Sequence, residues 1–202
     1  MKRTSGLLFV ISAPSGAGKT SLCRAITDSL GNLTHSISYA TRQPRPGEID
    51  GRDYYFVTQE RFQEMIKAGD FAEWAEVHAN LYGTSRRVLD DIIGRGIDVI
   101  LDIDTQGARQ IKTKYPDAIF IFIMPPSLEI LEERLRNRKS DREEEIKRRL
   151  QRAHGEIRDY GMYGYIVINR DFDRALSELR SIVTAERCRT RLADAAWIES
   201  MM

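Results

Sequence analysis

The segment from residue 13 to residue 20 places a lysine and a hydroxyl group in a glycine-rich turn. It consists of Ala13, Pro14, Ser15, Gly16, Ala17, Gly18, Lys19 and Thr20. The two glycines allow backbone N–H groups to approach an anion closely, as in a phosphate-binding loop at the start of a helix. In such a loop Lys19 would bridge the β- and γ-phosphates of a nucleoside triphosphate, and the Thr20 hydroxyl would bind Mg²⁺.

The first position of this loop departs from the strict pattern, because it is Ala13 rather than glycine. A turn that merely connects a strand to a helix is therefore the alternative interpretation. It is disfavoured because a lysine with no anion to bind would be costly to desolvate here. Nucleotide binding is the better interpretation, but a phosphate loop does not specify which molecule accepts the phosphate.

Two arginines three residues apart indicate a second anion site. Arg42 and Arg45 lie in a stretch stiffened by two prolines, so both guanidinium groups can be held at one point. Guanidinium forks match the oxygens of a phosphate group. Tyr54 and Tyr82 could add neutral hydroxyl donors, although either tyrosine could instead be an ordinary sheet residue.

Four polar side chains could recognise guanine, which presents an acceptor at O6 beside donors at N1 and N2. Glu73 lies among aromatic residues, and Asp102 follows an apolar strand at the sheet end where open α/β folds bind ligands. Ser38 and Thr84 supply hydroxyl groups, which can donate or accept. Neutral adenine has no N1–H, so a buried carboxylate aimed there would lose its partner. The residues are consistent with guanine recognition but do not prove it.

Continuous apolar runs predict the strands that would position these groups. They span residues 7–11, 99–101, 119–123 and 165–168. Because apolar residues stand at consecutive positions, both faces of each strand should be covered, which is typical of a parallel sheet flanked by helices. Residues 22–30 follow helical spacing directly after the glycine-rich turn. The sequence therefore predicts an α/β fold with the strand, loop and helix that a phosphate loop requires.

Between the first two of these strands lies a segment of different texture. Residues 35–97 are rich in Tyr, Arg, Gly and Pro. Strand-like sequence occurs near residues 54–57, and helical spacing occurs around residues 62–66 and 88–93. A small inserted α+β subdomain accounts for these patterns.

Two further helical patterns follow in the C-terminal half. Residues 129–152 are dense in charge and predict two helices joined by a mobile tip near residues 139–141. The last helix is expected to begin near Asp171 or Asp173. Its core stripe is predicted to comprise Ala175, Leu176, Leu179, Ile182 and Val183.

The composition of the chain argues against several classes of function. A formal net charge of +1 over 202 residues provides no global field for nucleic acid or a membrane surface. The apolar runs are too short to span a bilayer and a signal peptide is lacking, so a cytoplasmic protein is expected. Cys23 and Cys188 are expected to be buried free thiols. His35, His78 and His154 share no motif and are expected to be structural or surface residues.

Four motifs in the same order give the chain a resemblance to bacterial guanylate kinases along almost its whole length. They are segments 13–19, 41–48 with Gly51 and Tyr54, 82–84, and 101–107. The family's phosphate loop tolerates alanine at its first position, which accounts for Ala13. The pair Tyr39–Ala40 is unusual for the family, and Arg170 follows Asn169 where many relatives carry an acidic residue. Both departures should leave the chemistry intact.

The resemblance implies transfer of phosphate from ATP to GMP, and also to dGMP, in purine nucleotide metabolism. Mg²⁺ would enter with ATP as the cofactor. The fold would be a single domain over residues 1–202, of the P-loop NTPase type. Its core would comprise residues 5–34, 98–128 and 156–202, its GMP-binding subdomain residues 35–97, and its helical lid residues 129–155. The partners expected are ATP and GMP, without nucleic acid or membrane, and bacterial relatives are often homo-oligomers.

The resemblance also implies roles for individual residues. ATP would contact the whole loop of residues 13–20 together with Arg134 and Asn169. GMP would be bound by Ser38, Arg42, Arg45, Tyr54, Glu73, Tyr82, Thr84 and Asp102. The catalytic residues would be Lys19, Arg42, Arg134, Arg138 and Arg149. Asp104 would lie near the Mg²⁺ ion and the phosphates.

The expected mechanism needs no general base, because a phosphate group is already a nucleophile. Alignment of the acceptor and neutralisation of spreading charge would suffice, with the lid excluding water. Two rivals stay open: a guanylate-kinase-like module that binds peptides without catalysis, and a kinase of the same fold that acts on a ribosyl phosphate. The intact Lys19 and Thr20 argue against the first rival. The guanine-reading set of Glu73, Thr84 and Asp102 argues against the second.

Overall fold

A computed structural model describes residues 5–77, 79–137, 143–194 and 198–202. The strands are β1 Leu8–Ser12, β2 Leu33–His35, β3 Tyr39–Ala40, β4 Tyr55–Phe56, β5 Phe71–Val77, β6 Asn80–Ser85, β7 Asp98–Asp102, β8 Ile119–Met124 and β9 Tyr165–Ile168. The helices are α1 Lys19–Ser29, α2 Gln59–Ala68, α3 Arg86–Gly94, α4 Thr105–Lys114, α5 Leu128–Asn137, α6 Glu143–Arg158 and α7 Phe172–Arg187. Short 3₁₀ helices span Asp159–Met162 and Thr190–Leu192.

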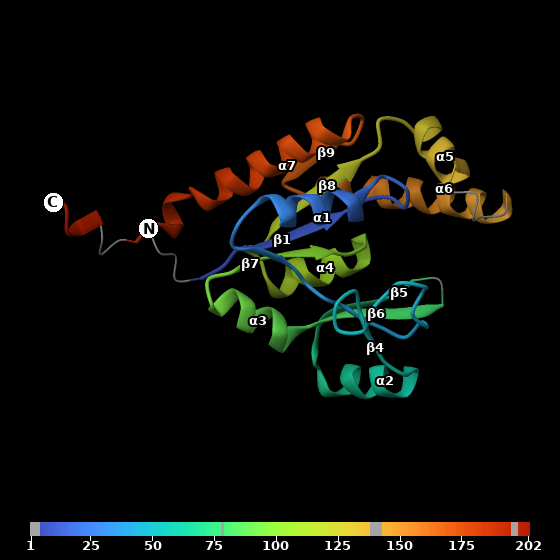
Figure 1. The fold of residues 1–202 in the computed structure, drawn as a ribbon, viewed down its shortest axis with the longest axis horizontal. Coiled ribbons are helices and arrows are strands. Elements are labelled where there is room, and N and C mark those ends of the chain that lie inside the picture. Colours follow the sequence, from blue (N-terminus) through green and yellow to red (C-terminus); the bar gives the residue numbers. More distant parts are fainter. Residues whose placement is uncertain (1–4, 78, 138–142, 195–197) are drawn as a thin grey trace.

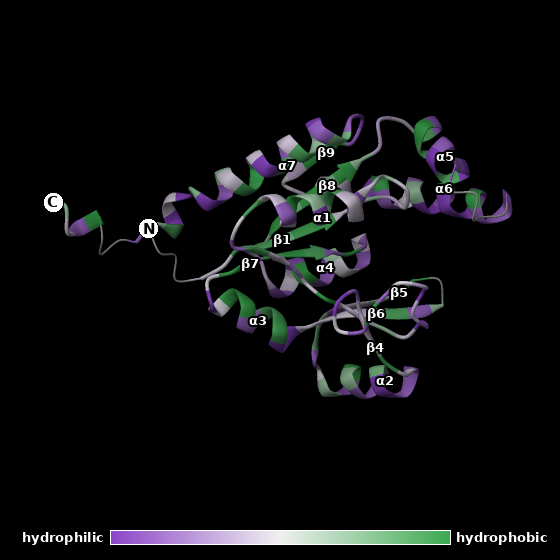
Figure 2. Cartoon of the chain, in the orientation of Figure 1, coloured by the Kyte–Doolittle hydropathy of each residue, from purple (hydrophilic) through white to green (hydrophobic). Residues whose placement is uncertain are grey.

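The core of the molecule is a parallel sheet in the strand order β2, β7, β1, β8, β9. Side chains of β1 alternate between its two buried faces. Phe9 and Ile11 pack with residues of α1 and α7, whereas Leu8 and Val10 pack with residues of α3 and α4. Figure 2 shows hydrophobic residues along these central strands and a mixture of hydrophilic and hydrophobic residues along the helices around them. Burial on both faces explains the continuous apolar runs of β1, β7 and β8, and the parallel sheet confirms the predicted α/β fold. The expectation that both faces are covered is wrong for β9, because this strand lies at the edge of the sheet and its Ile166 and Ile168 are exposed.

The edge strand β2 is not predicted by the sequence. Its residues are leucine, threonine and histidine, of which only Leu33 is buried. A strand at the edge of a sheet needs fewer apolar side chains, so its sequence resembles that of a loop. The four predicted core strands correspond to β1, β7, β8 and β9.

Strands β3 to β6 form a second sheet, in the order β4, β3, β6, β5. Helix α2 packs on it through Phe62, whose ring stacks on that of Phe71 with the centroids 4.4 Å apart. The hairpin of β5 and β6 is not predicted, because three successive residues of β5 are buried instead of alternating. Figure 1 shows this small sheet and the α5–α6 pair extending from the same side of the core.

The helices that follow the phosphate loop and the core strands begin in different ways. Asp104 accepts a hydrogen bond from the backbone N–H of Gly107 and caps α4. Asp171 caps α7 in the same way, which confirms the predicted start of that helix. Helix α1 begins after Gly18, whose φ of 90° is left-handed, and it has no side-chain cap. The N–H groups of its first turn are therefore available to an anion.

The structure corrects the expectation that both cysteines are buried. Cys23 is buried and free, but Cys188 is exposed. The reason is that Cys188 follows the last turn of α7, beyond the stripe that packs on the sheet. The expected helix tip near residues 139–141 lies outside the described residues. None of the helices in the described part of the chain is long and apolar enough to cross a membrane.

Candidate active site

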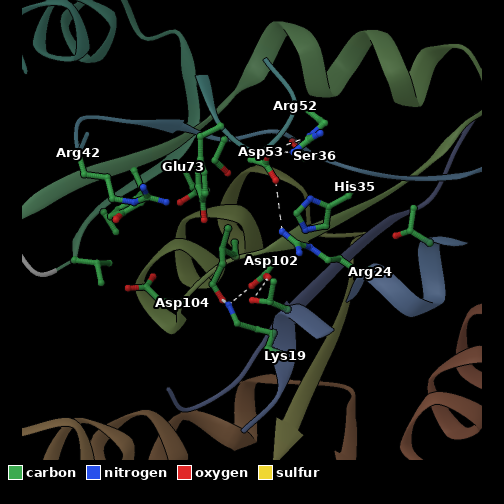
Figure 3. A pocket seen from close by; sticks show the side chains of 18 of the residues that line it. Lys19, Arg24, His35, Ser36, Arg42, Arg52, Asp53, Glu73, Asp102 and Asp104 are labelled. Atoms are coloured by element: carbon green, nitrogen blue, oxygen red, sulfur yellow. Dashed lines mark hydrogen bonds and ion pairs between the residues drawn. The ribbon is translucent and has the colours of Figure 1, made fainter. Parts of the chain in front are cut away.

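A cleft of about 700 Å³ is lined by the phosphate loop, the small sheet and the C-terminal end of β7. Figure 3 shows side chains from these three parts of the chain extending toward the cleft. The predicted site residues that line the cleft are Ser15, Lys19, Thr20, Ser38, Arg42, Arg45, Tyr54, Glu73, Tyr82, Asp102 and Asp104. Thr84 does not line the cleft, although it contacts Glu73. Arg134, Arg149 and Asn169 lie outside its wall, and Arg138 lies outside the described residues.

Lys19 is held at the cleft by Asp102. The two side chains form an ion pair, drawn in Figure 3, and the Lys19 ammonium also donates to the backbone oxygen of Ile103 at 3.2 Å. Thr20 Oγ1 donates to the other Asp102 oxygen at 3.1 Å. Burial alone would lower the pKa of Lys19 and raise that of Asp102, but their mutual attraction raises the first and lowers the second. Both groups are therefore charged at neutral pH.

Asp102, which was predicted to contact guanine, contacts residues of the phosphate loop in the structure. Its carboxylate contacts Lys19 and Thr20, so Asp102, the last residue of β7, borders the phosphate loop. Asp104, two residues further, accepts from Gly107 N at 2.9 Å and from Gln106 Nε2 at 3.0 Å. The two carboxylates thus stand on the phosphate side of the cleft in fixed orientations.

The phosphate loop is anchored by Asn169, which is only 5% exposed. Its Nδ2 donates to the backbone oxygen of Ala17 at 2.7 Å, and a Cβ at Gly18 would lie 2.4 Å from the same nitrogen. Arg134 donates to the backbone oxygen of Asn169 at 2.9 Å. Asn169 therefore contacts the loop directly, and Arg134 contacts it only through Asn169. Arg149, on α6, has its Nε 3.6 Å from Glu145 Oε1.

Arg42 is locked in one orientation by Glu48. Two guanidinium nitrogens donate to the two Glu48 oxygens at 2.6 and 2.7 Å, and the same carboxylate accepts from the Arg45 backbone at 2.8 Å. These contacts lower the pKa of Glu48 to about 2. The guanidinium carbon also lies 4.8 Å from the centre of the Tyr54 ring. Glu48 and the Tyr54 ring thus hold the Arg42 guanidinium group in one orientation before a ligand binds.

Glu73 is a buried carboxylate, 3% exposed, on the edge strand β5. Its Oε1 accepts a hydrogen bond from Thr84 Oγ1 at 2.6 Å. Burial raises the pKa of Glu73 to about 7, although the Thr84 hydrogen bond opposes that rise. A carboxylate in this state can accept from a neutral N–H donor and loses little hydration in doing so.

The structure adds cleft residues that the sequence analysis did not select. Across the cleft, a guanidinium nitrogen of Arg24 on α1 lies 3.6 Å from a carboxylate oxygen of Asp53, which precedes β4. His35, expected to be structural or on the surface, lines the cleft, and its buried Nε2 has no hydrogen-bond partner in the described structure. Glu156, on α6, does not line the cleft but is hydrogen-bonded by the Ser15 backbone of the phosphate loop, and burial raises its pKa to about 7. No local motif identifies these residues, because their partners are distant in sequence.

His154 is exposed, as expected, and His78 lies outside the described residues. Among the residues that the structure describes, no group of three or more His, Cys, Asp and Glu side chains could hold a metal ion. The oxygen donors next to the loop are the Thr20 hydroxyl and the carboxylates that follow β7.

Comparison with known proteins identifies the family. The family model for guanylate kinase matches residues 5–186. A guanylate kinase of Geobacter metallireducens is 56% identical over 190 residues, which cover 94% of this chain and 93% of that protein. One of Geobacter sulfurreducens is 55% identical over 196 residues, or 96% of each. The crystal structure of guanylate kinase from Anaplasma phagocytophilum has a TM-score of 0.79 at 33% identity and covers 95% of this chain and 92% of that one. The chain therefore belongs to the guanylate kinase family.

Proposed function

We propose that the chain transfers the γ-phosphate of ATP to GMP, with GDP and ADP as products. The observation that carries the proposal is one cleft that contains both the lysine of a phosphate loop and a buried carboxylate suited to guanine. The first binds a triphosphate and the second selects the base of the acceptor. Placing both in one cleft is what a direct transfer between two nucleotides requires.

The acceptor half of the site would be formed by residues 35–97, the proposed GMP-binding subdomain. Arg42, Arg45, Tyr54 and Tyr82 hold the GMP phosphate. The preorganised fork of Arg42 loses little side-chain entropy on binding. Ser38, Glu73 and Thr84 read the base, with the Glu73 carboxylate accepting from N1–H and N2–H₂ of guanine. Because none of these contacts requires the ribose 2′-hydroxyl, dGMP is proposed as a second acceptor.

The donor half would be formed by the loop residues 13–20. Its backbone N–H groups and Lys19 bind the β- and γ-phosphates of ATP. Mg²⁺ fits the oxygen donors present, since it commonly takes one or two protein ligands and completes its shell with phosphates and water. Thr20 and Asp104 would hold it, Thr20 directly and Asp104 from further away. When bound, the ion neutralises phosphate charge.

The transfer itself requires alignment and neutralisation of charge. The GMP phosphate is already nucleophilic, so no side chain has to remove a proton before attack. Lys19 stabilises the charge on the γ-phosphate, and Arg42 holds the attacking group in line. Residues 129–155 are proposed to act as the lid, bringing Arg134, Arg138 and Arg149 to the phosphates and excluding water. The core would comprise the remaining segments of a single domain.

The test is the formation of ADP from ATP and Mg²⁺ with GMP, dGMP, AMP, UMP or ribose phosphates as acceptors. We expect turnover with GMP and dGMP, its loss in Lys19→Ala, and a raised KM for GMP in Glu73→Ala. Turnover on a ribose phosphate would reject the assignment of the acceptor. Binding of GMP without turnover on any acceptor would indicate the peptide-binding class of module instead. Such an activity would place the chain in purine nucleotide metabolism.

A further inference from the structure

The edge strand that carries Glu73 is covered by a helix of the core. Gly107, Gln110 and Lys114 of α4 are spaced three and four residues apart, so they lie on one face of the helix. We call these three residues the α4 stripe. No local sequence pattern assigns any of them an individual role. Each contacts β5 at or next to Glu73, although α4 follows a strand of the other sheet.

The backbone on both sides of Glu73 is held by the two polar members of the stripe. Gln110 Nε2 donates to the backbone oxygen of Trp74 at 2.6 Å, and its Oε1 accepts from the Trp74 N–H at 3.2 Å. Lys114 Nζ donates to the backbone oxygen of Ala72 at 2.6 Å. The amide of Gln110 thus pairs with the open edge of β5 as a neighbouring strand would. Residues 72 and 74 flank Glu73, so its main chain is fixed from both directions.

The third member of the stripe, Gly107, leaves the space that the carboxylate of Glu73 occupies. A Cβ placed on Gly107 would lie 2.5 Å from Glu73 Oε2 and 3.2 Å from its Cδ. Only a glycine at this point of α4 leaves room for the carboxylate in its present position. Thr84 Oγ1 donates to the other oxygen, Oε1. Oε1 is therefore hydrogen-bonded from β6 of the same sheet, and Oε2 lies against the backbone of α4 at Gly107.

We propose that the α4 stripe positions Glu73 for guanine recognition and so determines which nucleoside monophosphate is accepted. The inference rests on the proposed function. Helix α4 begins directly after Asp104, on the phosphate side of the cleft, and ends beside β5. Helix α4 thus connects the phosphate side of the cleft to the strand that carries Glu73. A fixed distance between these points favours an acceptor whose base and phosphate match it.

The decisive variant is Gly107→Ala, because it separates positioning from folding. Alanine is favoured over glycine inside a helix, so α4 itself is not weakened. The added methyl group instead forces the end of the flexible Glu73 side chain to move. Gly94→Ala is the matched control: it is also a glycine of a helix, and its Cβ would meet nothing within 4 Å. IMP, which lacks the 2-amino group of guanine, reports how much of the base contact survives.

We expect the KM of Gly107→Ala for GMP to rise about tenfold or more, because a hydrogen bond to a charged group is lost. The ratio of kcat/KM for GMP over IMP should fall toward one, while the KM for ATP and the Tm stay near their wild-type values. Gly94→Ala should match the wild type in all of these. Gln110→Ala should raise the KM for GMP in the same direction. Lys114→Met should also raise the KM for GMP, whereas Lys114→Arg, which keeps the positive charge, should leave it near the wild-type value.

An unchanged KM for GMP and an unchanged GMP over IMP ratio in folded Gly107→Ala would overturn the inference. A parallel rise in the KM values for ATP and GMP with a lower Tm would also overturn it, since that result indicates a purely structural contact. If Gly107→Ala does not fold, Gln110→Ala decides by the same criteria, because its contact is at the exposed edge of β5. Absence of GMP turnover in the wild-type enzyme would reject the proposed function itself.

Discussion

Replacing Glu73 by glutamine should remove a specific part of the pH dependence of GMP binding. Burial raises the pKa of Glu73 to about 7 in the ligand-free protein. The N1 and N2 donors of guanine bind the ionised carboxylate better than the protonated acid. The affinity of the wild-type enzyme for GMP should therefore increase as the pH rises through 7. Glutamine has the same shape and no carboxyl proton to lose, so Glu73→Gln should lack this part of the pH dependence.

The size of the effect follows from the position of the pKa. With a pKa of about 7, the ionised fraction rises from roughly one tenth at pH 6 to roughly nine tenths at pH 8, so the KM for GMP should fall about tenfold. The GMP phosphate, with a pKa of about 6, also titrates in this range. Its contribution is common to both proteins and cancels when the wild type is compared with Glu73→Gln.

The same shift predicts how the stability of the ligand-free protein depends on pH. Because the folded pKa of Glu73 lies above its ordinary value of 4.5, this group stabilises the fold fully below pH 4.5, and the contribution is lost as the pH rises through 7. A shift of this size corresponds to roughly 3 kcal/mol. Glu73→Gln should therefore gain stability relative to the wild type between pH 5 and pH 8.

Two measurements test this reasoning. Steady-state rates at varied GMP between pH 6 and pH 8 give the KM for both proteins, and denaturant unfolding at pH 5 and pH 8 gives their stabilities. Parallel KM profiles for the wild type and Glu73→Gln would refute the argument. So would equal changes in unfolding free energy, because then Glu73 would already be ionised throughout this range.

Three further substitutions test the phosphate side and the core. Lys19→Met should lower kcat at least about a hundredfold, since it removes the charge next to the γ-phosphate and leaves Asp102 without its cation; activity near wild type would contradict this role. Asn169→Ala should raise the KM for ATP about fivefold through loss of the bond to Ala17, with the KM for GMP unchanged. Arg187→Ala should lower the free energy of unfolding, measured with denaturant, by roughly 3 kcal/mol, because its partner Asp98 is a fully buried carboxylate. Neither KM should change.

Features that depend on near neighbours in the chain can be predicted without the structure. Apolar runs at consecutive positions predict the buried strands, because both faces of a parallel sheet are covered. The glycine-rich turn after residues 7–11 predicts the phosphate loop, and Asp171 predicts the start of α7. Even the preorganisation of Arg42 is local, since its partner Glu48 is only six residues away.

The contacts that hold the site together could not be predicted, because they join residues that are distant in the chain. Asn169 reaches the loop from 152 residues away, Thr20 meets Asp102 across 82, and Gln110 pairs with Trp74 across 36. A local pattern cannot encode such pairs, because their distances depend on how the two sheets and their helices pack. The raised pKa of Glu73 has the same origin. Its burial is produced by the paired strand β6 and by α4, which is separated from β5 in the chain by β6, α3 and β7. Desolvation acts only once both elements enclose the carboxylate.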